Sequence, residues 1–98
     1  MKINKTKEGN KLTIALEGRL DTTTAPELEA ALREEFDSID SLVINLADLD
    51  YVSSAGLRVF LMSQKEMSKK GGMVITNVIA EIMEVFELTG FTDILTIQ

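Results

Sequence analysis

Residues 41–61 read SLVINLADLDYVSSAGLRVFL, and this stretch decides the fold. Its first six residues, SLVINL, are apolar on both faces and rich in β-branched side chains, which is typical of a central strand. Ser53 is the best candidate for the N-cap of a following helix, because its hydroxyl can accept a hydrogen bond from a backbone N–H one turn ahead. We expect that helix from about Ser54 to Lys70, where KKGG adds positive charge and a glycine stop.

The residues before this stretch predict two strands and a helix. KINKTK alternates weakly and leads into a turn signal, and KLTIALEG places every second residue on an apolar face, so the two segments form a hairpin. In TTTAPELEAALREEF, Thr24 and Glu27 have the spacing of a capping box. Apolar residues then recur at helical spacing as far as Phe36, which predicts an amphipathic helix.

The residues after it predict a strand, a third helix and a last strand. MVIT is short and apolar, and Asn77 is a candidate N-cap for the next helix. Gly90, followed by an apolar residue, is a good helix ending, and DILTIQ closes the chain as a strand. The inner face of this helix is expected to consist of Ile79, Ile82, Met83 and Phe86.

The order of elements predicts an α/β fold. No repeat, low-complexity tract or linker divides residues 1–98, so we expect one domain. Each strand–helix–strand step should cross over right-handed and give parallel neighbours, while the hairpin adds an antiparallel edge. The polar second face of KLTIALEG indicates that little covers it. We therefore predict two layers, a mixed β-sheet with an N-terminal hairpin and helices mainly on one face.

The composition excludes several classes of function. A formal net charge of −6, one tyrosine and no tryptophan argue against nucleic-acid binding. The lack of cysteine and histidine removes disulfides, thiolate chemistry, most zinc sites and the usual general base. No Walker-type or nucleophile motif is present, which argues against an enzyme and leaves no cofactor to expect. We see no signal peptide and no apolar run that could insert into a membrane, so we expect a cytoplasmic protein.

Polar residues gather in three segments, RLDTTTAP, ADLDYVSS and NVIA, each directly after a predicted strand. In open α/β sheets such segments meet at one edge, and sites form there. Aspartates in these segments could in principle hold Mg²⁺, but loop aspartates are more often turn formers, so we expect no metal site. The expected rim consists of Asp21, Thr22, Thr23, Asp48, Asp50, Ser53, Ser54 and Asn77.

Ser54 is the most distinctive member of this rim. At the first helical position its hydroxyl would point outward, and Ala55 and Gly56 would keep the neighbouring surface low enough for another molecule to approach. The helix N-terminus favours an anion there. These features suit a serine that a kinase modifies. The alternative is a capped helix start with a small residue for packing, which periodicity alone favours.

The stretch VINLADLDYVSSAGLRVFL resembles the signature of the STAS domain, the fold of bacterial anti-sigma-factor antagonists. That signature is a strand, an acidic L-x-x-L loop, an aromatic residue and a serine-containing tetrad that ends in Gly-Leu. LEGRLDTTTAPELEAAL resembles the second strand and first helix of the family, and KKGGMVITNVIAEIMEVFELTGFTDIL resembles its later part. The resemblance covers essentially the whole chain.

The resemblance implies a binding protein whose serine is phosphorylated by an anti-sigma factor that is an ATP-dependent serine kinase. The unphosphorylated form binds that kinase and frees sigma factor, which regulates transcription, and a metal-dependent serine phosphatase reverses the modification. The acceptor lies two residues before the family glycine, which Gly56 matches, so the acceptor is Ser54. Asp21 matches the acidic residue that flanks the site. Ser53 replaces the usual aspartate of the tetrad and is the fallback acceptor.

The same resemblance implies a partner-binding surface around the acceptor. Arg58, one turn after Ser54, is a better candidate for a partner contact than Lys69 or Lys70, whose positive charge complements the end of the helix. The replaced aspartate keeps a second interpretation open, namely an unphosphorylated STAS-like subunit of a membrane transport complex or signalling scaffold. The expected partner-binding residues are Asp21, Thr22, Thr23, Asp48, Asp50, Ser53, Ala55, Gly56 and Arg58.

Overall fold

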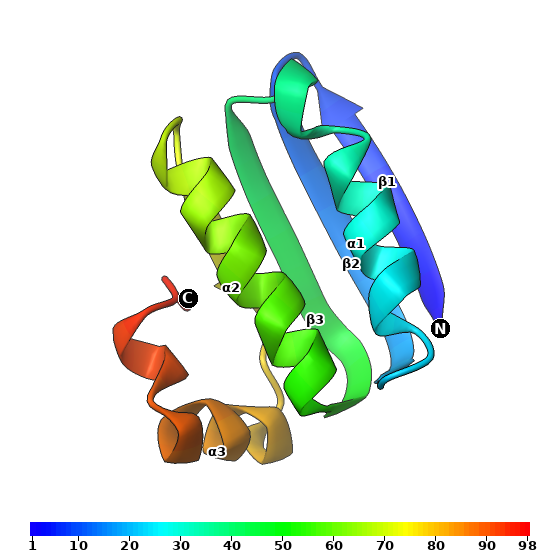
Figure 1. Ribbon diagram of the computed structural model, residues 1–98, viewed down its shortest axis with the longest axis vertical. Helices are drawn as coiled ribbons and strands as arrows, with labels where there is room; N and C mark the ends of the chain where they lie inside the picture. Colours follow the sequence, from blue (N-terminus) through cyan, green and yellow to red (C-terminus); the bar gives the residue numbers. More distant parts are fainter.

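The computed structural model describes residues 1–98 and contains a four-stranded mixed sheet in the order β1-β2-β3-β4. β1 pairs antiparallel with β2, and the other two pairings are parallel. α1 and α2 lie side by side on one face of the sheet (Figure 1). The predicted α/β fold is confirmed. In chain order the elements are β1 (Lys2–Glu8), β2 (Lys11–Leu20), α1 (Ala25–Arg33), η1 (Phe36–Ser38), β3 (Ser41–Val52), α2 (Ser54–Ser68), β4 (Met73–Thr76), α3 (Ala80–Thr89) and η2 (Phe91–Asp93).

The core lies between the sheet and its helices. Alternate residues of β2, beginning with Leu12 and Ile14, are fully buried on the helix face, as the alternating pattern predicts. The rings of Phe60 on α2 and Phe86 on α3 meet edge to face with their centroids 6.1 Å apart, which joins α3 to the helix layer. The opposite face of the sheet is uncovered, and Val43 on β3 is only half-buried there. The sheet order places β3 between β2 and β4, so the predicted central strand is confirmed, and the helices lie mainly on one face as expected.

The chain end differs from the predicted last strand. Gly90 ends α3 with a left-handed φ of 79°, as expected, but η2 follows and takes up the beginning of DILTIQ. Only a single bridge, between Ile75 and Ile97, connects the end of the chain to β4. The backbone N–H of Ile75 donates to the carbonyl of Thr96 at 2.9 Å, so the last residues run beside β4 without forming a full strand.

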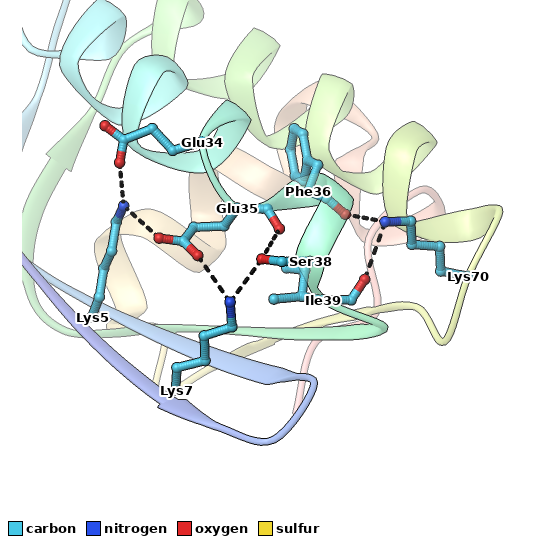
Figure 2. Close-up of polar contacts among 8 residues, drawn as sticks. All are labelled: Lys5, Lys7, Glu34, Glu35, Phe36, Ser38, Ile39 and Lys70. Atoms are coloured by element: carbon cyan, nitrogen blue, oxygen red, sulfur yellow. Dashed lines mark hydrogen bonds and ion pairs between the residues drawn. The ribbon is translucent and has the colours of Figure 1, made fainter.

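α1 is shorter than predicted, and lysine side chains stabilise the turn that follows it. The helix ends at Arg33, and Phe36 is buried in η1 instead. Figure 2 shows Lys5 donating to Glu34 and Glu35 at 3.0 and 3.1 Å. The hydrogen bond from Lys5 holds the pKa of the Glu35 carboxyl below its usual value, against the effect of burial.

Lys70, just beyond α2, donates to the backbone carbonyls of Phe36 and Ile39, so it closes the end of η1 (Figure 2). Charged donors on otherwise unpaired carbonyls stabilise a fold more than exposed ion pairs do. We expect Lys70→Met to lower the free energy of unfolding by about 1–2 kcal/mol, measured by urea denaturation. The matched control is Lys69→Met, which removes only an exposed ion pair to Glu66 at 3.8 Å and should change stability by less than about 0.5 kcal/mol. Equal effects of the two variants would contradict this role of Lys70.

Candidate functional site

The junction between β3 and α2 positions the candidate site. Ser53 has extended backbone angles, and its Oγ accepts a hydrogen bond from the Gly56 N–H at 3.3 Å. Its own N–H donates to the carbonyl of Leu20 at 2.8 Å, which ties the junction to the end of β2. The predicted N-cap is therefore confirmed, and the Ser53 hydroxyl already has a structural role.

Ser54 is the first residue of α2 and is exposed. Its hydroxyl takes part in none of the side-chain hydrogen bonds of the protein, whereas the neighbouring Ser53 hydroxyl caps the helix. Ala55, the next residue, is half-buried. Of the two serines, Ser54 is thus the one that another molecule can reach without breaking an internal contact.

Gly56 is buried and faces the sheet. A Cβ atom at this position would lie 2.6 Å from Cγ of Leu20 and 3.0 Å from Cγ2 of Val52. The missing side chain therefore lets the first turn of α2 approach the ends of β2 and β3. The expectation that Gly56 leaves room for a partner is wrong, because the room it leaves is filled by Leu20. For this residue the packing alternative holds.

Asp21 follows β2 and organises the turn into α1. Its Oδ1 accepts hydrogen bonds from the N–H groups of Thr23 and Thr24, both at 3.0 Å, and from the Thr23 hydroxyl at 2.7 Å. The Thr24 hydroxyl points back, donating to the carbonyl of Arg19 and accepting from the N–H of Asp21, both at 2.8 Å. The predicted capping box of Thr24 and Glu27 is therefore wrong, since Thr24 makes no side-chain cap to α1.

The hydrogen bonds around Asp21 lower its pKa from 3.8 to about 2, chiefly through the hydroxyl of Thr23 and then the N–H of Thr24. Because the folded protein binds this proton less tightly than the unfolded chain, ionised Asp21 contributes stability above about pH 4 that disappears as the pH falls through about 2. We expect Asp21→Asn to reduce the decrease of the urea midpoint between pH 4 and pH 2. Asp37→Asn, at an exposed position of η1, is the control. If the urea midpoint of Asp21→Asn falls between pH 4 and pH 2 as much as that of the wild type, ionised Asp21 is not the source of this stability.

β3 continues where a loop was predicted. Asp48 and Asp50 are exposed but belong to this strand, because β2 also runs on to Leu20 and pairs with it. The register shifts twice along this stretch, and Asp48 pairs with Glu17. Since paired residues share a face and Glu17 follows buried Leu16, Asp48 lies on the uncovered face of the sheet. The prediction that Asp48 and Asp50 lie in a loop is wrong.

Asn77 has a different role from the predicted N-cap. Ile79 occupies the N-cap position of α3 and makes no side-chain cap. Asn77 has a left-handed φ of 56°, which asparagine tolerates, and its Nδ2 donates to Oδ1 of Asn45 at 3.1 Å. The same Oδ1 accepts from the N–H of Ala47 at 3.0 Å. This asparagine pair holds the loop after β4 against the first register shift in β3, a contact that the sequence analysis missed.

The remaining rim residues are accessible. Thr22 and Thr23 are exposed in the turn before α1, and Arg58 is exposed on α2 and forms no ion pair. No group of three or more acidic, histidine or cysteine side chains is placed to hold a metal ion. No helix combines the length and the apolar character needed to cross a membrane. The geometry thus offers an exposed, unpaired hydroxyl at a helix start, beside exposed polar side chains.

Comparison with known proteins identifies the family. The sequence model of the STAS domain matches residues 2–98. This chain belongs to the STAS domain family. This chain is 36% identical to BtrV of Bordetella bronchiseptica, a protein named as an anti-sigma factor antagonist. The match covers 96% of this chain and 83% of that protein. The chain is 31% identical to the anti-sigma-B factor antagonist of Bacillus subtilis, over 91% of this chain and 83% of the relative.

Solved structures show the same fold. An anti-sigma factor antagonist from Mycobacterium paratuberculosis superposes with a TM-score of 0.88 at 23% identity, covering 98% of this chain and 83% of that one. The unphosphorylated form of the antagonist SpoIIAA gives a TM-score of 0.85 at 17% identity, covering 99% of this chain and 88% of that one. The resemblance predicted from the β3–α2 stretch is therefore confirmed for the family and its fold.

Proposed function

We propose that this STAS domain is an anti-sigma factor antagonist controlled by phosphorylation of Ser54. In the unphosphorylated form it binds an anti-sigma factor that is a serine kinase, which frees sigma factor for transcription in the cytoplasm. It acts by binding and has no catalytic role, and a metal-dependent serine phosphatase restores the binding form. The names of its relatives support the class of protein. The observation that carries the site is the exposed hydroxyl of Ser54, which is free beside a Ser53 hydroxyl that caps α2.

The effect of the phosphate is electrostatic. Phosphorylation adds about −1.5 to −2 charges and three acceptor oxygens at the start of α2. The helix dipole offsets part of this charge, by about 0.3–1 kcal/mol, so the domain remains folded. The partner must instead desolvate a dianion at the start of α2, which is hydrogen-bonded through Ser53 to Leu20, the residue before Asp21. The lowered pKa of Asp21 keeps a second negative charge there. The modification therefore weakens the complex while the antagonist itself stays intact.

The test is phosphorylation with the serine-kinase anti-sigma factors of the source organism and ATP, followed by mass mapping of the modified residue. We expect one phosphate on Ser54 in the wild-type protein and in Ser53→Ala, and none in Ser54→Ala. Phosphate on Ser53 alone would contradict the site. No phosphate with any of these kinases would favour the unphosphorylated subunit of a transport complex or signalling scaffold.

A further inference from the structure

The C-terminal part of the chain has an unusual charge distribution. All ten lysine and arginine residues lie within residues 1–70, so α3 and η2 carry acidic side chains without a basic one. These acids are exposed and take part in no ion pair. They are Glu81, Glu84, Glu87 and Asp93.

Large apolar side chains are exposed in the same segment. The protein exposes three large hydrophobic residues, and one of them, Tyr51, has the guanidinium of Arg19 over its ring at 4.2 Å. The other two are Leu88, 80% exposed on α3, and Ile94, 45% exposed just after η2. On α3, Glu84 lies one turn before Leu88 and therefore on the same face. The segment thus presents apolar side chains bordered by carboxylates.

The stability of the domain does not explain this arrangement. Glu87 lies in the last turn of α3, where the helix dipole disfavours a negative charge, and no basic side chain in that turn compensates it. Leu88 is almost fully exposed and contributes little to the core. Exposed apolar side chains and unpaired carboxylates that the fold does not require, close together in the chain, indicate a contact with another molecule.

We propose that α3 and η2 form a second part of the surface that binds the anti-sigma kinase, named here the α3–η2 face and defined by Glu84, Glu87, Leu88 and Ile94. This inference rests on the proposed function. The matching partner surface is an apolar recess bordered by lysine or arginine side chains. A second copy of this chain fits less well, because two α3–η2 faces would place carboxylates against one another. The acidic charge also excludes a nucleic-acid partner.

The position of α3 makes a shared partner geometrically reasonable. α3 lies at the end of the sheet where α2 begins (Figure 1), and its Phe86 packs on Phe60 of α2. α3 begins beside the start of α2 and runs away from it toward η2, so a protein that covers Ser54 reaches the α3–η2 face by extending along α3 (Figure 1). Because this face contains no modified residue, its contribution to binding should not depend on the state of Ser54.

The test is titration calorimetry of the purified kinase with the wild-type chain and with variants that change the α3–η2 face. Truncating an exposed apolar anchor should weaken binding about tenfold, so we expect that loss for Leu88→Ala. Reversing a complementary charge should have a similar effect and reduce the dependence on salt, so we expect about a tenfold loss for Glu84→Lys. Asp37→Lys makes the same change of charge on η1, at the other end of the molecule, and should bind as the wild type does (Figure 1).

The outcomes separate this inference from the proposed function. Suppose that the wild type binds, that Ser54→Asp does not, and that Leu88→Ala and Glu84→Lys bind normally. The proposed role of the α3–η2 face in binding is then overturned, and the proposed function stands. If Asp37→Lys weakens binding as much as Glu84→Lys, the effect comes from the net charge of the protein, and the role of the α3–η2 face in binding is likewise overturned. If the wild type binds none of the kinases, the proposed function fails, and this inference fails with it. Thermal unfolding of each variant confirms that the domain is intact.

Discussion

Ser54→Asp will weaken the complex with the anti-sigma kinase by about a hundredfold, whereas Ser54→Ala will bind as the wild type does. The reason is the exposure of Ser54 at the start of α2, where a partner must remove water from any charge placed there. Crowding or unpairing a desolvated charge at an interface costs about 2–5 kcal/mol, and about 1.4 kcal/mol is a factor of ten in affinity. Titration calorimetry with the purified kinase measures the difference directly.

The control for this prediction is Ser68→Asp, which places the same charge at the exposed end of the same helix. It should leave the affinity within about twofold of the wild type, because screening at physiological salt limits an exposed charge to about 8 Å. Both aspartate variants should give wild-type circular dichroism. If Ser54→Asp and Ser54→Ala bind equally well, the phosphorylation switch is wrong even though the family assignment remains.

Gly56→Ala will lower the free energy of unfolding by about 1–3 kcal/mol, the usual cost of inserting a methyl group into a packed core. The new Cβ would stand 2.6 Å from Cγ and 2.8 Å from Cδ2 of Leu20, closer than carbon atoms approach in proteins. Alanine is favoured over glycine in helices by about 1 kcal/mol, so a net loss shows that the clash exceeds the gain in propensity. Urea denaturation at neutral pH provides the measurement.

A double-mutant cycle provides the control for Gly56. Leu20→Ala removes the two atoms that the new methyl group would approach most closely and by itself costs about 2–5 kcal/mol. In that background Gly56→Ala should cost clearly less than in the wild type, because only Cγ2 of Val52, at 3.0 Å, then remains close to the new methyl group. If Gly56→Ala has the same cost in both backgrounds, packing against Leu20 is not the reason for the glycine.

Much of the fold follows from local spacing in the sequence. β2, β4 and α2 have a regular period of apolar residues, and each lies where that period places it. The continuation of β3 was missed because its buried residues, Leu46, Leu49 and Val52, are three apart and fit neither a strand nor a helix in isolation. The two register shifts explain this spacing, since each adds a residue that has no partner on β2.

The candidate site was predictable only in part. The cap at Ser53 and the exposed position of Ser54 follow from local helix chemistry, and the structure confirms both. The direction in which Gly56 faces depends on where Leu20 lies, and periodicity does not contain that information. The role of Asn77 is not contained in the local sequence for a similar reason, because its partner Asn45 lies on β3, 32 residues earlier in the chain. Local sequence patterns are misleading for residues such as these, whose contact partners lie far away in the sequence.

The uncovered face of the sheet has a practical consequence for measuring these interactions. Thr6 and Thr13 pair across β1 and β2, on the face that the helices leave bare and away from Ser54. The chain contains no cysteine, so Thr6→Cys would create a unique attachment point for a fluorescent dye. A probe at that position leaves the start of α2 and the α3–η2 face free, and its emission anisotropy follows the antagonist into and out of its complexes in real time.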